Sequence, residues 1–309
     1  MFRPLKNLLR ARRAFLKYLW TTSYNLISGA NTPKKHIKID DEERQLSPEG
    51  FSLRQSHSRL PRALKMLLLS LLTLLILLLL IAYTIYKPPT FIISFLQWKY
   101  PSVLFHLPLP SNQKLIALTI DDAPSPYTSQ ILDLLQKYNA KATFFIIGSQ
   151  LSSHPDLLSR IHAEGHETGS HAWRDEPSLS LPLAELKAQI QELDPLLPEN
   201  GNGEKYFRPG SGFFSKRMVE MVSGLGYRTV LGSVYPHDPQ IHSARWNARH
   251  VLSMVRPGAV VIVHDRRGYS VDEVERILKG LKEGGWKVES LGGLLKVAEE
   301  ERVRKGGRA

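Results

Sequence analysis

Residues 115–124 read LIALTIDDAP, and this stretch decides the fold class. The six mostly apolar residues at 115–120 are long enough for a buried strand. They are followed at once by two adjacent carboxylates, Asp121 and Asp122, and by a proline turn. In folds built from parallel strands, functional side chains collect at the carboxyl ends of the strands. We therefore predict a buried strand whose carboxyl end carries chemistry.

The same alternation of short apolar runs and amphipathic stretches continues from this strand to residue 291. It predicts further strands at 142–147, 227–231, 259–263 and 287–291, with a short segment that reaches His171. It predicts helices at 127–138, 156–164, 183–193, 215–225, 247–255 and 272–282. Strands that alternate with helices favour a mainly parallel sheet or barrel, so the predicted fold class is α/β.

The net charge of +12 lies mostly at the amino-terminal end of the 309-residue chain. Residues 1–65 contain 14 Lys and Arg against 5 Asp and Glu, which leaves only +3 for the remainder. A basic chain can indicate nucleic-acid binding, but here the charge precedes an apolar run and suits membrane topology, so we expect no nucleic-acid partner. The absence of cysteine excludes a disulfide framework, a zinc finger and a cysteine nucleophile.

Residues 66–86 read MLLLSLLTLLILLLLIAYTIY and contain no charged residue. A helix of this length, at about 1.5 Å per residue, crosses the ~30 Å hydrocarbon core of a bilayer, and a buried core helix is the alternative. The positive-inside rule places the basic side in the cytosol. We expect a single-pass type II membrane protein: a disordered cytosolic tail (1–65), the span (66–86), a proline-rich stalk (87–112), a lumenal or extracellular domain (113–300) and a disordered tail (301–309).

Two motifs contain residue types that bind metals. In TIDDAP, one of the two carboxylates could bind a metal while the other acts as a base; a helix N-cap with a turn aspartate is the alternative. In HAWRD, His171 and Asp175 are four residues apart and could share a metal with Asp122 in an open three-ligand site. A surface His–Asp pair is the alternative for the second motif.

Two further motifs carry a cation and a proton donor. FRPGSG places Arg208 in a glycine-rich loop, where its guanidinium could hold a carboxylate through two hydrogen bonds. VIVHD places His264 at the mouth of a strand that should be deeply buried. A histidine there is either a general acid or a core residue with its hydrogen bonds satisfied.

Together and in this order, the motifs resemble those of the polysaccharide deacetylase family. Its NodB-homology domain occurs in chitin and peptidoglycan deacetylases of carbohydrate esterase family 4. The resemblance covers roughly residues 113–295 and implies a distorted (β/α) barrel. TIDDAP resembles the family's TFDDGP, GHETGSHAWRD the context of its HxxxH motif, FRPGSG its RPPYG loop, and VIVH its LxH motif.

The resemblance implies metal-dependent hydrolysis of the N-acetyl amide of an amino-sugar polymer or glycan, as in chitin deacetylases, with release of acetate. It implies that Asp121 is the base, that Arg208 braces it, and that His264 protonates the leaving amine with support from Asp238. The implied metal is Zn²⁺, or another divalent ion such as Co²⁺. Its implied ligands are Asp122, His171 and Asp175.

The chain departs from the family pattern at two places. Asp175 stands where the second histidine of HxxxH is expected, which makes the ligand set more anionic. Pro239 replaces the tryptophan of the family's DxxDW motif. Trp173 and Tyr235 are candidate sugar-stacking residues, although either could belong to the core. The alternative functions are a catalytically weakened glycan-binding relative, a deformylase or deacetylase of a glycolipid, and a membrane-anchored interaction module.

Overall fold

The computed structural model describes residues 61–306 of the chain. The predicted cytosolic tail therefore lies outside the described residues apart from residues 61–65, and so do residues 307–309.

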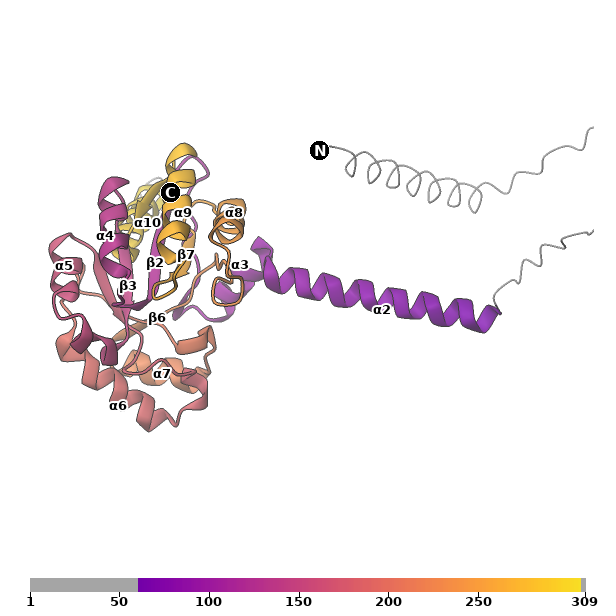
Figure 1. Ribbon diagram of the computed structural model, residues 1–309, viewed down its shortest axis with the longest axis horizontal. Coiled ribbons are helices and arrows are strands. Elements are labelled where there is room, and N and C mark those ends of the chain that lie inside the picture. Colours follow the sequence, from indigo (N-terminus) through magenta and orange to yellow (C-terminus); the bar gives the residue numbers. More distant parts are fainter. Residues whose placement is uncertain (1–60, 307–309) are drawn as a thin grey trace, which may run out of the picture. The chain divides into compact units, whose positions relative to one another are not determined.

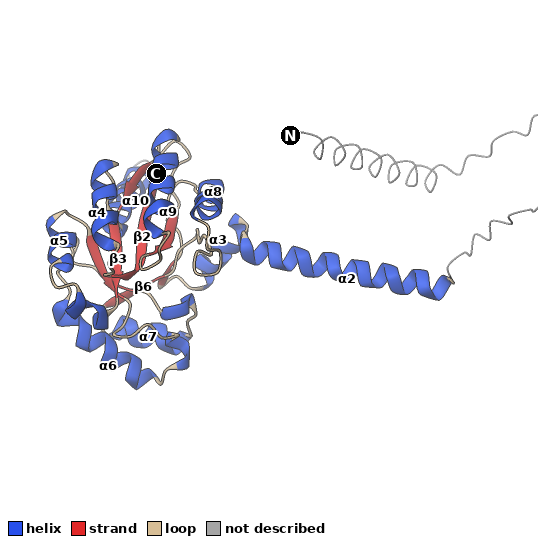
Figure 2. Cartoon of the chain, in the orientation of Figure 1, coloured by secondary structure: helices blue, strands red, loops and turns tan. Residues whose placement is uncertain are grey.

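The domain is built on a sheet of eight parallel strands in the described part of the chain (Figure 2). Their spatial order is β1-β6-β5-β4-β3-β2-β7, and β8 pairs with the first part of β2. The strands are β1 (Val103–Leu104), β2 (Leu115–Ala123), β3 (Ala142–Ile146), β4 (Glu167–Ser170), β5 (Lys205–Phe207), β6 (Tyr227–Val230), β7 (Val260–His264) and β8 (Lys287–Glu289).

The sheet curls until its two edges approach each other. Just beyond β1, His106 forms an isolated bridge with Ala259, the residue before β7, and Val234, beyond β6, bridges to Val261 within β7. The result is a barrel that is closed by isolated bridges rather than by a full ladder. This confirms the predicted α/β class with a curled, barrel-like parallel sheet.

Helices surround the sheet (Figure 1). They are α3 (Thr90–Lys99), α4 (Thr128–Lys137), α5 (Leu157–Ala163), α6 (Leu183–Leu193), α7 (Lys216–Gly224), α8 (Ala244–Met254), α9 (Ser270–Glu283) and α10 (Leu291–Gly306). Helix α2 (Arg62–Tyr86) precedes them and has no buried residue. The predicted helix at 183–193 is reproduced at both ends, and α8 begins three residues before its predicted start.

Strand β2 is the centre of the fold because it pairs with three other strands and all nine of its residues are buried. On one face, Ile116, Leu118 and Ile120 belong to the large core under α4 and α9. On the other face, Leu115 and Ala117 belong to a smaller cluster inside the curled sheet. A strand that is buried on both faces shows no polar alternation, which is why it reads as one apolar run.

The structure corrects two predicted boundaries. Residues 90–99 of the predicted stalk form helix α3, because Pro88 and Pro89 precede its first turn instead of interrupting it. The predicted disordered tail from residue 301 continues as part of α10 as far as Gly306. Strands β1 and β5, of two and three residues, are too short to be recognised as apolar runs.

Helix α2 is the one helix among residues 61–306 that is long enough and apolar enough to cross a membrane, judged by length and composition alone. It has 25 residues and a mean hydropathy of 2.9 over its most apolar window, and none of that window is buried.

The close approach of Gly258 to the chain before β2 gives a testable prediction. A Cβ at Gly258 would lie 1.4 Å from the carbonyl oxygen of Leu107, whereas a Cβ at Gly285 would meet nothing within 4 Å. Both glycines have positive φ, 81° and 71°. We expect Gly285→Ala to lower the free energy of unfolding by about 1 kcal/mol and Gly258→Ala by about 3 kcal/mol or more. Urea titration followed by circular dichroism measures both, and equal losses would contradict the proposed steric cause.

Candidate active site

The carboxyl ends of four strands bring the predicted site residues to one edge of the sheet. Asp121 and Asp122 lie in the last part of β2, His171 follows β4, Arg208 follows β5 and His264 ends β7. All five line a cavity of about 630 Å³. The clustering at strand ends that the sequence predicts is therefore present in the structure.

The two adjacent aspartates both reach this cavity because the backbone changes direction between them. In a regular strand, neighbouring side chains point to opposite faces. Here Asp122 has a φ of 65°, in the left-handed region, and the register between β2 and β3 shifts between Ile120 and Ala123. Such irregular backbone at a strand end re-aims a side chain, and the result places both carboxylates in the cavity.

Arg208 holds Asp121 in one orientation. Its guanidinium is 2% exposed and forms an ion pair with Asp121 through Nη1. The same nitrogen donates to Oγ1 of Thr119 at 2.8 Å, and Nη2 donates to the carbonyl oxygen of Leu231 at 2.7 Å. The guanidinium also lies 4.1 Å from the centroid of the Phe145 ring. Because a buried charge needs such partners, the arginine and the aspartate fix each other.

His264 is oriented by Asp238. Its Nδ1 lies 2.9 Å from Oδ1 of Asp238, and its backbone nitrogen donates to Oδ2 of the same carboxylate at 2.9 Å. This leaves Nε2 facing the cavity, 4.0 Å from Oδ2 of Asp121. Burial lowers the pKa of His264, but the hydrogen bond and the charge of Asp238, together with Asp121 and Asp122, outweigh it and raise the pKa to about 9. The ring is therefore protonated at neutral pH.

His171 and Asp122 present two donor atoms that suit a divalent metal. Nδ1 of His171 lies 2.8 Å from the carbonyl oxygen of Arg208, and since a carbonyl only accepts, Nδ1 carries the proton. Nε2 is then an acceptor, 3.7 Å from Oδ1 of Asp122. A histidine whose other nitrogen is fixed by a carbonyl is the usual arrangement of a metal ligand.

Asp175 does not join this pair. Its carboxylate forms an ion pair with Nη2 of Arg266, and the same nitrogen lies 3.6 Å from Oδ2 of Asp122. Burial raises the pKa of Asp175, but the hydrogen bond and charge of Arg266 exceed this effect and lower the pKa overall. Within residues 61–306, no three His, Cys, Asp or Glu side chains are arranged as a metal site. All three predicted ligands line the same cavity, but Arg266 occupies the carboxylate of Asp175, and a ligand role for Asp175 stays a prediction.

The two candidate stacking residues have different surroundings. Tyr235 lines the cavity, and its ring lies 5.8 Å from that of His264. Trp173 packs against the large core and over Gly148, where a Cβ would lie 2.2 Å from the indole ring. Trp173 is not among the residues that line the cavity, so its position agrees with the core alternative.

Sequence reasoning missed the cations that follow β7. Arg266 pairs with Asp175, and Arg267 lines the cavity. Arg266 has a φ of 69°, and its backbone nitrogen donates to the buried Asp265 at 2.7 Å. Asp265 also accepts from Oγ of Ser125 at 2.6 Å, which ties this turn to the loop after β2. The sequence does contain a signal for these cations, since both arginines directly follow VIVHD. They come just after the end of a strand, where functional side chains collect.

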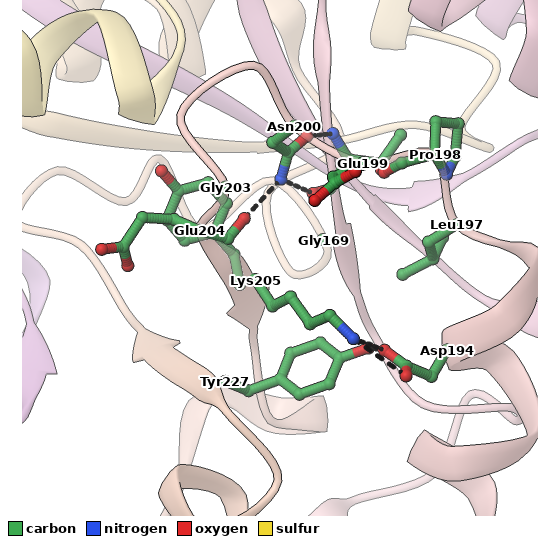
Figure 3. Close-up of a pocket in the computed structure, with 12 residues that line it drawn as sticks. Gly169, Asp194, Leu197, Pro198, Glu199, Asn200, Gly203, Glu204, Lys205 and Tyr227 are labelled. Carbon is green, nitrogen blue, oxygen red and sulfur yellow. Dashed lines mark hydrogen bonds and ion pairs between the residues drawn. The ribbon is translucent and has the colours of Figure 1, made fainter.

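A smaller cavity of about 240 Å³ lies near the amino-terminal ends of β4, β5 and β6 (Figure 3). Lys205 and Tyr227 converge on Asp194, and Lys205 lies 2.8 Å from its Oδ1. Asn200 donates to the carbonyl oxygens of Thr168 and Glu204, each at 2.9 Å. These polar groups satisfy one another, so we assign this cavity to structure rather than to chemistry.

Comparison with known proteins agrees with the motifs. A family model described as polysaccharide deacetylase matches residues 109–230. The chain is 32% identical over 194 residues to a peptidoglycan-N-acetylglucosamine deacetylase of Bacillus cereus, and the match covers 61% of this chain and 91% of that protein. The solved structure of the peptidoglycan deacetylase PdaC of Bacillus subtilis is similar with a TM-score of 0.59 at 29% identity, covering 65% of this chain and 98% of the other.

The fold alone does not distinguish active members from inactive ones. A solved CE4 family pseudoenzyme of Bacillus anthracis is also similar, with a TM-score of 0.56 at 26% identity, covering 63% of this chain and 69% of the other. Membership, by contrast, rests on sequence identity along nearly the whole of a named deacetylase and on a matching α/β fold. This chain is a member of the polysaccharide deacetylase family.

Proposed function

We propose that this chain hydrolyses the N-acetyl amide of an amino sugar in a glycan and releases acetate. The observation that carries the proposal is the placement of Asp121 and His264 side by side in the cavity, each held by a buried partner. Asp121 is held by Arg208, and His264 is held by Asp238, with 4.0 Å between Oδ2 of Asp121 and Nε2 of His264. A glycan-binding domain without catalysis needs neither group in this state.

The proposed reaction consumes one water molecule for each amide. The water oxygen bonds to the acetyl carbon while Asp121 takes one of its protons. His264 then donates its proton to the amide nitrogen as the carbon–nitrogen bond breaks, and acetate and a free amine leave. General acid–base catalysis of this kind contributes about 10²–10⁴-fold to a rate. Arg208 holds the base in one orientation, and the hydrogen bond and charge of Asp238 raise the pKa of the acid.

A metal is expected at this site because deacetylases of the family generally depend on one. We propose that Asp122 and His171 hold it, and that Asp175 joins them when Arg266 releases its carboxylate. A bound Zn²⁺ or Co²⁺ supplies Lewis-acid chemistry toward the acetyl carbonyl.

The proposed substrate is a glycan that contains N-acetylglucosamine, either chitin-like or peptidoglycan. Similar proteins are named as deacetylases of N-acetylglucosamine and of N-acetylmuramic acid in peptidoglycan. The residues after the apolar segment carry little net charge, which suits an uncharged sugar. Tyr235, at the wall of the cavity, offers a face on which a sugar ring can stack.

We also propose that α2 spans a membrane with its amino-terminal side in the cytosol, so that the domain is lumenal or extracellular. The length and hydropathy of α2 support the span. Arg54 and Arg59, before α2, and Arg62 and Lys65, in its first turn, support the orientation.

Replacing the proposed base tests the assignment directly. We expect Asp121→Asn to lower acetate release from an N-acetylglucosamine oligomer by about 10²–10⁴-fold, because the amide cannot accept a proton from water. The matched control is Asp272→Asn, which changes an exposed carboxylate on α9 that pairs with Arg276. Equal activity in the wild type and Asp121→Asn would remove Asp121 from the mechanism.

The pH dependence tests the acid. Because His264 must carry its proton, we expect kcat/KM to fall as the pH rises through about 9, the pKa that Asp238 helps to maintain. Asp238→Asn removes the negative charge that stabilises the imidazolium, so the alkaline limb should move to lower pH. A profile of acetate release from pH 6 to pH 10 measures the shift. An alkaline limb at the same pH in both proteins would contradict the assigned pairing.

The pair of Arg266 and Asp175 predicts a change in metal affinity. Arg266→Ala removes a positive charge from the site and frees the carboxylate, so we expect Zn²⁺ to bind at least about tenfold more tightly in isothermal titration calorimetry, or about 1.4 kcal/mol. Arg249→Ala, on α8, is the control for the loss of an arginine.

The double variant separates charge from ligation. In the Arg266→Ala background, Asp175→Ala should abolish most of the gain if Asp175 becomes a ligand. If the double variant binds Zn²⁺ as tightly as Arg266→Ala, Asp175 is not a ligand.

A further inference from the structure

The cavity that holds the acid and the base extends to helix α3. Ile93 and Leu96 of α3 line it, together with Phe105 and the exposed Phe213. The lining of the cavity therefore combines the charged groups of the site with apolar side chains from α3 and its neighbours. Apolar side chains offer no hydrogen bonds to sugar hydroxyl groups, so this part of the lining suits a second, apolar group on the substrate.

Helix α3 is apolar on both of its faces. On the inner face, Ile93 is buried in a cluster with Val103 and Phe105. On the outer face, Phe91, Phe95 and Trp98 are 70%, 51% and 76% exposed. The rings of Phe95 and Trp98 lie side by side, with centroids 5.9 Å apart, and exposed apolar side chains that lie together mark a contact surface. Within residues 61–306, no element covers this outer face.

The position of α3 in the chain indicates what covers it. Only Lys87, Pro88 and Pro89 separate α3 from α2. A connection of this length keeps the first residue of α3 on the order of 10 Å from the end of α2. The connection is also fixed to the domain. The Tyr86 ring lies 4.2 Å from that of His250, and Nζ of Lys87 donates to Oγ of Ser253 at 2.9 Å.

The residue types on the outer face match a bilayer surface. Tryptophan and tyrosine concentrate where a membrane meets water, and lysine side chains extend from there to the headgroups. On the outer face, Trp98 is followed by Lys99, and Nζ of Lys99 lies 5.8 Å from the centroid of the Phe95 ring.

We propose that the outer face of α3 lies in the bilayer surface and that the cavity takes an N-acetylated amino sugar attached to a lipid. The sugar lies between Asp121 and His264, and the apolar part of the substrate leaves the cavity along Ile93, Leu96 and Phe213. This substrate class rests on the proposed deacetylase function and on the proposed membrane span.

The first experiment measures the membrane contact without using activity. The full chain is reconstituted in phosphatidylcholine vesicles, with and without lipids brominated near the headgroup end of the acyl chain. We expect the brominated lipids to quench Trp98, and the quenched fraction of the emission to fall in Trp98→Phe. Trp246→Phe, which removes another exposed tryptophan, is the matched control. Unchanged quenching in Trp98→Phe would overturn the placement of α3.

The second experiment compares two substrates of the same chemistry. Acetate release is measured from N-acetylglucosaminyl-diacylglycerol in those vesicles and from a soluble N-acetylglucosamine tetramer. The variant is Phe91→Ser/Phe95→Ser/Trp98→Ser, and the control is Leu196→Ser/Val303→Ser, two exposed apolar residues outside α3. We expect the triple variant to lose at least tenfold in turnover of the lipid-linked substrate and less than twofold with the tetramer.

The outcomes separate this inference from the proposed function. If the wild type cleaves the tetramer but not the lipid-linked sugar, the inference fails and the deacetylase function stands. Equal losses on both substrates would mean that α3 only supports the fold, which also overturns the inference. If neither substrate releases acetate, the proposed function fails, and the lipid-linked substrate class fails with it.

Discussion

The ion pair of Arg208 and Asp121 is the interaction on which the rest of the site depends. It joins the loop after β5 to the end of β2 across the inside of the curled sheet. The other nitrogens of Arg208 donate to carbonyl oxygens at the end of β6 and just after it, Val230 and Leu231. Removing one partner of a buried charge pair leaves the other uncompensated, which costs about 3–5 kcal/mol. The same contact that aims the base therefore also holds three strand ends in register.

The fold and the centre of the site follow from local patterns in the sequence. LIALTIDDAP and VIVHD are buried strands that pair with each other, and their polar ends meet because parallel strands carry their carboxyl ends to one edge. Helix α3 was missed because two prolines precede it, and prolines before a helix resemble those of an extended stalk. The pairing of Arg266 with Asp175 could not be predicted, since 91 residues separate them and neither motif specifies a partner for the other.

Three aspartates and two arginines lie close together in the site, and the pairs that they form determine which carboxylates are free to bind a metal. Asp121 is held by Arg208, Asp122 faces His171, and Asp175 is paired with Arg266. A histidine in place of Asp175 would carry no negative charge for Arg266 to neutralise. Asp175, which departs from the family pattern, and Arg266, which follows VIVHD, therefore form one ion pair. Replacing either residue leaves the charge of the other without a partner.

Helix α3 connects the apolar helix α2 to the domain that contains the site. It follows α2 after three residues, yet Ile93 packs into the domain, and α3 and β1 both precede residue 113, where the sequence resemblance starts. A fragment cut at residue 113 would lack a strand at the edge of the sheet and one wall of the cavity. Such a fragment would keep Asp121 and His264 but would lose Ile93, Leu96 and Phe105 from the lining of the cavity. A fragment that retains every residue lining the cavity must therefore include α3 from Ile93 onward.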